Sequence, residues 1–536
     1  MAGGAQKMID VVQVGGLKVP LASHLSPDFE YQYVANDHYD DATDKQAPFA
    51  NQLLKQTYQT AIFLVSAGSA LLTDLALVQN LPAYQILYDQ NLTLPAAIAA
   101  LFEQKGAQPI SLRDPAAVAK LINQDYFGSQ MGQKLLFDDL IIEPTFLEDV
   151  HQMGHNRLTF AASFGQQSRQ IASWESFGTL PADWQLTFLP EATVTSGDVE
   201  VSFKLYMISY DGRNTIKAVI TKTLAELQVP FALPVYNELT LCKVTVWARG
   251  AGVIRLGNCH FRRSRHDRGE LMAGGQRLVD RQNMGSELLV YFNPGDLKPP
   301  LNVYFSGYRE AEGFEAIFMM RNLSSPFMVI GDPRISGGAF YMGSQQLEDD
   351  LVRAIQERLD QLHFNNDQLI LSGLSMGTYG ALYYAARLKP HAVVVGKPLV
   401  NLGTVAKNER IKRPGGFPTS LDILLWQTGR ADSLGVDELN LRFWRQFGQG
   451  NFENTTFAIT YMKEDDYDGE AFQVLFRTLR QRFPNVKVLY KGLTGRHNDD
   501  TNGIVKWFLA QYNNLLWTDF NRPRPRLKMP ENPTSE

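Results

Sequence analysis

The fold is decided by the stretch Asp367-Gln-Leu-Ile-Leu-Ser-Gly-Leu-Ser-Met-Gly-Thr-Tyr-Gly-Ala-Leu-Tyr-Tyr-Ala-Ala-Arg387. Leu369 to Leu371 form a short apolar run of the strand type, whereas Thr378 to Leu388 are helix formers with apolar residues at helical spacing. Between them lies Gly373-Leu-Ser375-Met-Gly377, which fits the pattern G-x-S-x-G. In that pattern a serine stands on a sharp strand-to-helix turn above the edge of a sheet. The stretch therefore predicts Ser375 as a nucleophile.

The glycines of this turn have a physical purpose. A serine on so tight a turn has neighbours packed against it, and glycine removes the Cβ atoms that would clash there. The turn also leaves the amide of Met376 at a helix N-terminus, where it can donate a hydrogen bond to an oxyanion. A glycine-rich turn with an idle serine is the alternative that so short a pattern leaves open.

A serine hydroxyl becomes a good nucleophile only when a base takes its proton. In the order typical of α/β-hydrolases, an acid follows one of the later strands and a histidine follows the last. The last predicted strand, Val486 to Tyr490, is followed by His497, which we interpret as the base. A loop histidine that caps the next helix is the alternative.

The acid follows the preceding strand, Phe457 to Met462, where several carboxylates crowd one turn. Asp465 stands in the usual place for the residue that orients the imidazole and stabilises its charged form. Glu464 comes one residue earlier, and its longer side chain could also reach the histidine. The sequence favours Asp465 and leaves Glu464 open.

A second oxyanion donor is expected in the loop after an early strand of the same sheet. Gly307 and Tyr308, which end the strand Val303 to Ser306, fit that place. Each such donor contributes about 3 to 4 kcal/mol in the transition state. The loop Arg413 to Pro418 is rich in proline and glycine, as lids over sites of this class often are.

The whole chain predicts an α/β fold with four regions. Residues 1–164 alternate strands and helices, which predicts a parallel sheet with a scaffold or docking role. Residues 165–290 alternate with period two, which predicts an antiparallel β-sandwich that binds sugars or partner proteins, or only packs a core. Residues 291–520 form the α/β-hydrolase-like, doubly wound catalytic domain, and residues 521–536 are polar and proline-rich, which predicts a disordered tail.

Composition excludes several classes of function. The 536 residues are 44% hydrophobic and 20% charged, as in a soluble globular protein, and a net charge of −5 argues against nucleic-acid binding. Cys242 and Cys259 are too few for a disulfide framework, and no cysteine or histidine spacing predicts a metal site. No signal peptide or transmembrane stretch is evident, so we expect a cytoplasmic protein. No cofactor is predicted.

Several motifs between about residues 250 and 510 resemble one family, the second accessory secretory proteins of the accessory Sec system. The motifs are Gly257-Asn-Cys-His-Phe-Arg-Arg-Ser-Arg-His-Asp-Arg-Gly269, Tyr291-Phe-Asn-Pro-Gly-Asp-Leu-Lys-Pro-Pro300, Phe305-Ser-Gly-Tyr308, Gly373-Leu-Ser-Met-Gly-Thr-Tyr-Gly380, Arg413-Pro-Gly-Gly-Phe-Pro-Thr-Ser420 and Tyr461-Met-Lys-Glu-Asp-Asp-Tyr-Asp468.

The resemblance implies a bacterial cytoplasmic protein that works with the first and third accessory secretory proteins and the accessory Sec motor ATPase. It further implies export of serine-rich repeat glycoprotein adhesins, peripheral association with the translocon at the inner face of the membrane, and O-acetylation of N-acetylglucosamine on the adhesin. The family's triad would fall on Ser375, Asp465 (or Glu464) and His497. The acetyl donor is not identified by the sequence. A non-catalytic export scaffold or a cytoplasmic serine esterase is the alternative.

Overall fold

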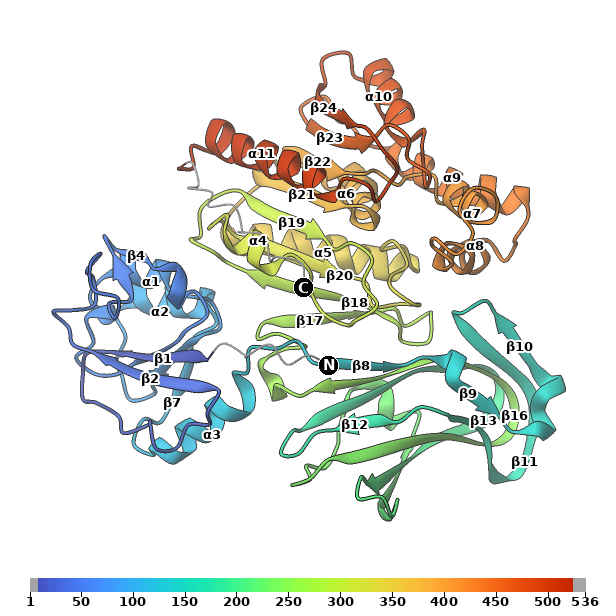
Figure 1. The fold of residues 1–536 in the computed structure, drawn as a ribbon, viewed down its shortest axis with the longest axis horizontal. Coiled ribbons are helices and arrows are strands. Elements are labelled where there is room, and N and C mark those ends of the chain that lie inside the picture. The colour runs from blue at the N-terminus through green and yellow to red at the C-terminus, as the bar shows by residue number, and fades with distance from the viewer. Residues whose placement is uncertain (1–7, 524–536) are drawn as a thin grey trace.

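The computed structural model describes residues 8–523, which form three large sheets and the helices that cover two of them (Figure 1). The helices span Leu75–Asn80 (α1), Ala96–Gln104 (α2), Pro115–Asp125 (α3), Ile317–Arg321 (α4), Gln345–Leu362 (α5), Met376–Leu388 (α6), Leu402–Ile411 (α7), Thr419–Thr428 (α8), Ser433–Phe447 (α9), Ala471–Arg482 (α10) and Thr501–Phe520 (α11).

The first sheet lies at one end of the molecule and is parallel throughout, as the alternation of strands and helices predicts. Its order is β2-β1-β5-β6-β7, and apolar clusters cover both of its faces. Its strands are β1 (Ile9–Val14), β2 (Phe29–Val34), β5 (Ile62–Val65), β6 (Ile86–Asp89) and β7 (Gln108–Ile110), and the short strands β3 (Phe49–Ala50) and β4 (Leu53–Leu54) pair beside it.

The second sheet is antiparallel and folds back over itself. Its longest strands bend so far that the rings of Phe188 and Phe203, on one strand, lie 6.2 Å apart. A straight strand would separate them by about 50 Å. The two layers of the predicted sandwich are therefore two halves of the same strands. These strands are β8 (Gly132–Leu135), β9 (Leu140–Ile142), β10 (Val150–Met153), β11 (Arg157–Trp174), β12 (Gly178–Leu180), β13 (Leu186–Ser209), β14 (Ile216–Thr223), β15 (Phe231–Ala232) and β16 (Thr240–Arg263).

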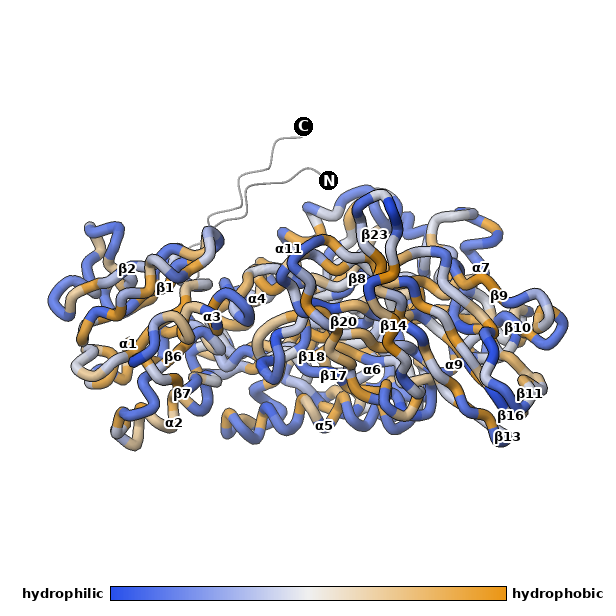
Figure 2. The backbone as a smooth tube through the Cα atoms, turned by 90° about the horizontal axis from the view of Figure 1, so that it is seen from below, coloured by the Kyte–Doolittle hydropathy of each residue, from blue (hydrophilic) through white to orange (hydrophobic). Residues whose placement is uncertain are grey.

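The third sheet has the order β17-β18-β20-β19-β21-β22-β23-β24 and is parallel from β20 onward. Helices α4 and α11 contribute to the apolar cluster on one face, and α5, α6 and α10 to the cluster on the other. In Figure 2, hydrophobic and hydrophilic segments alternate along α5, as expected for a helix with one buried face. Its strands are β17 (Gly275–Val279), β18 (Glu287–Asn293), β19 (Leu301–Phe305), β20 (Phe327–Gly331), β21 (Leu369–Leu374), β22 (Ala392–Gly396), β23 (Thr456–Met462) and β24 (Lys487–Leu493).

Sheet membership corrects the predicted boundaries at residues 164 and 290. Strands β8 to β11 begin well before residue 165 and pair within the second sheet, and β17 and β18 begin before residue 291 and pair within the third. Both errors have one cause, because a strand's own pattern of side chains does not say which neighbour completes its hydrogen bonds.

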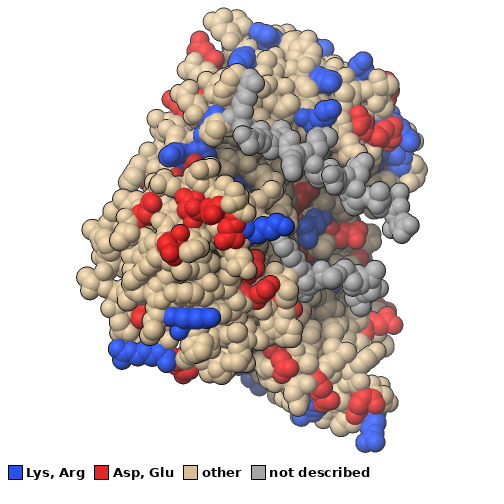
Figure 3. All heavy atoms as spheres, turned by 60° about the vertical axis from the view of Figure 1, so that its left-hand side comes forward, with Lys and Arg blue, Asp and Glu red and all other residues tan. Residues whose placement is uncertain are grey.

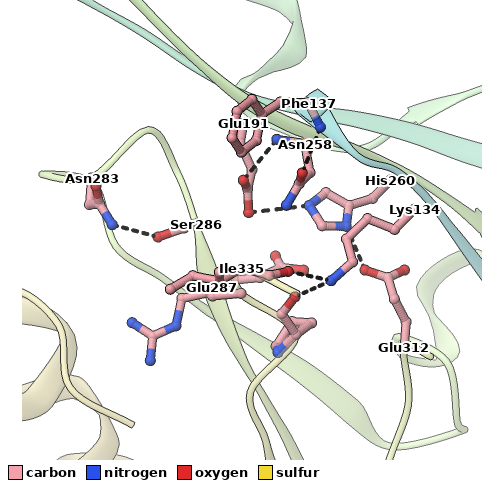
Figure 4. A network of polar contacts seen from close by, with 12 residues as sticks. Lys134, Phe137, Glu191, Asn258, His260, Asn283, Ser286, Glu287, Glu312 and Ile335 are labelled. Atoms are coloured by element: carbon pink, nitrogen blue, oxygen red, sulfur yellow. Dashed lines mark hydrogen bonds and ion pairs between the residues drawn. The ribbon is translucent and has the colours of Figure 1, made fainter. Parts of the chain in front are cut away.

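Buried charges join the second sheet to the third (Figure 4). His260, on β16, lies 2.5 Å through Nδ1 from Glu312 Oε1 and 3.4 Å through Nε2 from Glu191 Oε1. Arg262 lies on the same strand as His260 and forms ion pairs with Glu312 and Glu287. Lys134, on β8, donates to the carbonyl oxygens of residues 333 and 335. The charges balance across the boundary, which fixes how the two sheets meet.

The predicted tail falls mostly outside the described residues, since residues 524–536 are not described. Its first part is corrected, because Arg522 is buried and its guanidinium lies 3.0 Å from the carboxylate of Asp296.

On the face of the molecule shown in Figure 3, basic side chains are scattered among acidic ones.

Candidate active site

Ser375 stands between β21 and α6 on a backbone that serine rarely adopts, with φ 51° and ψ −118°. The end of the adjacent strand β22 holds the turn, because the Ser375 amide donates to Gly396 O at 2.8 Å. A Cβ at Gly373 would lie 2.4 Å from the backbone of Gly377, and one at Gly377 would lie 2.0 Å from Phe305 O. Only glycine fits at both positions, which is why the G-x-S-x-G pattern makes this turn.

His497 and Asp465 lie in line with the serine. Ser375 Oγ is 2.9 Å from His497 Nε2, and His497 Nδ1 is 2.7 Å from Asp465 Oδ2. The His497 side chain is 1% exposed and that of Asp465 is 6% exposed. Burial favours the protonated carboxyl, but the hydrogen bond from His497 and those from the amides of residues 467 and 468 outweigh it, so the pKa of Asp465 is lowered. The carboxylate therefore stays charged beside the imidazole.

Glu464 lies elsewhere. Its carboxylate accepts a hydrogen bond from the amide of Gly495, and its side chain is on the surface. Of the two carboxylates that the sequence leaves open, the structure brings only Asp465 to His497. Asp466 accepts a hydrogen bond from the His497 amide at 3.2 Å, which helps to fix the histidine loop.

The three predicted oxyanion donors differ in what they contact. The Gly307 amide donates to Glu315 Oε2 at 2.6 Å and is therefore already occupied. In residues 8–523, the amides of Met376 and Tyr308 make no hydrogen bond to another protein group. These two amides are therefore free to donate, whereas the Gly307 amide would have to leave Glu315 first. The sequence could not show this, because the carboxylate that takes the amide comes from a different turn.

Aromatic residues and the predicted lid loop cover the histidine. The Tyr467 ring stacks on the His497 imidazole with centroids 4.2 Å apart, and the Arg413 guanidinium lies 3.1 Å from the Tyr467 ring centre. Phe417, in the same loop, packs edge-on against Tyr308 at 5.4 Å. Sequence reasoning missed Tyr467, although it comes two residues after the acid.

The arrangement suits acyl transfer through a covalent serine ester. A hydroxyl, a base that can take its proton, and a carboxylate that holds the base are the parts such chemistry needs. No cluster of side chains in residues 8–523 could hold a metal ion. Across the same residues, each helix is too short or too polar to cross a bilayer.

Comparisons with known proteins place the chain in a family. The family model described as "Accessory Sec system GspB-transporter" matches residues 9–522. An accessory Sec system protein of Staphylococcus aureus is 41% identical over 416 residues, which cover 77% of this chain and 78% of that protein. An accessory Sec system protein of Streptococcus gordonii is 36% identical over 462 residues, covering 85% and 88%. This chain belongs to their family, the second accessory secretory proteins of the accessory Sec system.

A solved structure agrees with this assignment. The Glycosylation Associate Protein (Gap123) complex from Streptococcus agalactiae contains a chain that is 34% identical, with a TM-score of 0.81, over 96% of this chain and 99% of that chain. The similarity therefore extends over nearly the whole chain, and the predicted family resemblance is confirmed.

Proposed function

We propose that this protein O-acetylates N-acetylglucosamine on serine-rich repeat glycoproteins that the accessory Sec system exports. Ser375 Oγ gives its proton to His497 and attacks the acetyl carbonyl carbon. The bond from that carbon to the donor's leaving group breaks, and the leaving group takes the proton from His497. A sugar hydroxyl then gives its proton to His497 and attacks the acetyl-serine, which forms the acetylated sugar and frees Ser375 as its proton returns.

The observation that carries this proposal is the continuous chain from Ser375 Oγ through His497 to Asp465, at 2.9 and 2.7 Å. The amides of Met376 and Tyr308 would stabilise the oxyanion, each by about 3 to 4 kcal/mol. Asp465, with its lowered pKa, would stabilise the imidazolium that forms in each half of the reaction.

Labelling with a serine-directed fluorophosphonate tests whether the serine is activated. We expect wild-type protein to be labelled and Ser375→Ala to take no label. His497→Ala should react slower by several orders of magnitude, because the hydroxyl loses its base. Wild-type protein that is folded and still takes no label would contradict the proposal.

Export itself is a second function, which the family description and the match to a multi-protein complex favour. In this role the chain would be a scaffold that catalyses no reaction. It would bind the adhesin, the first and third accessory secretory proteins and the motor ATPase. An export assay with Ser375→Ala separates the two roles. Normal export of unacetylated adhesin would mean that export does not need the serine.

A further inference from the structure

Lys397 is a charged residue beside the candidate nucleophile that the acyl-transfer mechanism does not use. It directly follows β22, between the strand that leads to Ser375 and the strand that leads to Asp465. Gly396 O accepts the Ser375 amide, and the Lys397 amide donates to Thr460 O at 2.8 Å. Lys397 also has a φ of 60°, which non-glycine residues seldom adopt. Strained residues of this kind cluster at functional sites.

Most of the Lys397 residue is buried, but its ammonium keeps some exposure and has no partner among the described residues. The residue is 6% exposed, and within residues 8–523 its ammonium makes no hydrogen bond or ion pair. Lys105, also buried, shows the usual solution, since its ammonium donates to the carbonyl oxygens of Gln79, Leu81 and Gly295. A buried charge without such partners is costly. The Lys397 ammonium lacks the acceptors that Lys105 has and keeps some exposure, so a ligand bound beside Ser375 can supply them.

Two carboxylates flank Lys397 at longer range, and one of them has an open oxygen. The Lys397 charge interacts with both Asp465 and Glu315, and burial lowers the pKa of its ammonium. Glu315 gives Oε2 to the Gly307 amide, whereas no described group donates to its Oε1. Glu315 is only partly buried. The site therefore offers an unpaired donor and an unpaired acceptor close to Ser375.

The chemistry of this pair selects the class of ligand. An anionic ligand would meet the carboxylates of Asp465 and Glu315 as well as the ammonium. A neutral hydroxyl or acetamido group can accept from the ammonium and donate to the carboxylate. We propose that Lys397 and Glu315 bind the acceptor sugar, with the Lys397 ammonium donating to a sugar oxygen and Glu315 Oε1 accepting from a sugar hydroxyl. This inference rests on the proposed acetyl transfer and assigns its acceptor subsite.

The test measures where the acetyl group goes. Full-length protein receives p-nitrophenyl acetate as donor and methyl N-acetylglucosaminide as acceptor, and the ratio of acetylated sugar to free acetate is measured. We expect Lys397→Met to lower this ratio about tenfold or more, since hydrogen bonds to charged groups are lost. Glu315→Gln keeps an oxygen for the Gly307 amide and should lower the ratio less. Lys491→Met, which removes an exposed lysine from β24, is the matched control.

Melting temperature distinguishes a binding role from a structural one. Lys397→Met removes a charge that has no hydrogen-bond or ion-pair partner within residues 8–523, so we expect it to melt no lower than wild type while transferring less. Transfer ratios equal to wild type in Lys397→Met and Glu315→Gln would overturn the inference, and so would a large fall in the melting temperature of Lys397→Met. Wild-type protein that takes neither a fluorophosphonate label nor an acetyl group would instead refute the proposed function, and the acceptor subsite with it.

Discussion

The backbone of Ser375 has a conformation that residues with a side chain seldom adopt, and the glycines around it make this conformation possible. The helix after the turn approaches β19 so closely that Gly377 touches the carbonyl of Phe305. The position of the nucleophile therefore depends on neighbouring residues that have no Cβ atom.

We expect Gly377→Ala to disable the site and to destabilise the fold. The new Cβ would lie 2.0 Å from Phe305 O, so α6 must shift, at a cost of about 1 to 3 kcal/mol. Fluorophosphonate labelling should fall and thermal unfolding should begin earlier. Gly128→Ala is the control, because its Cβ would meet only the flexible end of Ile9. Normal labelling of Gly377→Ala would show that the turn tolerates the extra carbon.

A second change at this scale identifies the acid. Asp465→Asn keeps the size of the side chain but removes the charge and changes the tautomer of His497, so ester turnover should fall on the order of ten thousandfold. Glu464→Gln can still accept from the Gly495 amide and should turn over like wild type. The reverse pattern would move the acid to Glu464.

Most of this site could be predicted from the sequence, and the residues that could not be predicted show what the sequence lacks. Ser375 and His497 follow from strand order and a short pattern. The choice between Asp465 and Glu464 needs the direction of each side chain, which adjacent residues on one turn do not reveal. Lys397 could have been found, because it follows a predicted strand at the edge where ligands bind parallel sheets.

Among the elements, the long strands of the second sheet depend on glycine where they bend. Gly197 and Gly250, on facing strands β13 and β16, have φ of 87° and 93°. A Cβ at Gly250 would lie 2.1 Å from Asp198 O. The bend allows one sheet to enclose its own core, in which Phe188 and Phe203 meet.

Gly250→Ala should therefore open this sheet. Both the positive φ and the contact with Asp198 oppose the new side chain, with a combined cost of about 2 to 4 kcal/mol. Differential scanning calorimetry and tryptophan fluorescence would show the loss. Gly212→Ala is a matched control, because Gly212 also has a positive φ of 78° but has open space around it. Equal effects of the two variants would assign the cost to the backbone alone.

The strands themselves were predictable, whereas their partners were not. Alternation with period two indicates strand segments within β13 and β16, but not that each is one continuous long strand. It does not reveal that one sheet forms both layers, because that depends on bulges and on glycine conformations far apart in the chain. For the same reason the boundary predicted at residue 164 leaves the residues of β8 to β10 in the N-terminal region, although they pair within the second sheet.

In the whole molecule, the second and third sheets meet through charges that water does not reach. Burial disfavours a charged His260, but Glu312 and Glu191 outweigh burial and raise its pKa to about 9. Arg262 lies beside it, between Glu312 and Glu287, and the pKa of Glu312 is lowered by Arg262 and His260 against the effect of burial. The boundary between the sheets is thus held by a protonated imidazole.

This protonation makes the joint between the sheets sensitive to alkali. A histidine whose pKa is raised by folding stabilises the protein fully below its unfolded pKa, about 6.5, and this contribution is lost as the pH rises through about 9. We expect the free energy of unfolding to fall on the order of 3 kcal/mol between about pH 6 and pH 10 through this group.

His260→Gln should be less stable than wild type at pH 6 and should lose most of that pH dependence, because glutamine carries no charge to lose. His151→Gln, which alters an exposed histidine on β10, should keep the wild-type slope. Chemical denaturation at each pH measures the slope. An unchanged slope in His260→Gln would mean that the buried imidazole is neutral and that Arg262 and Lys134 join the two sheets without it.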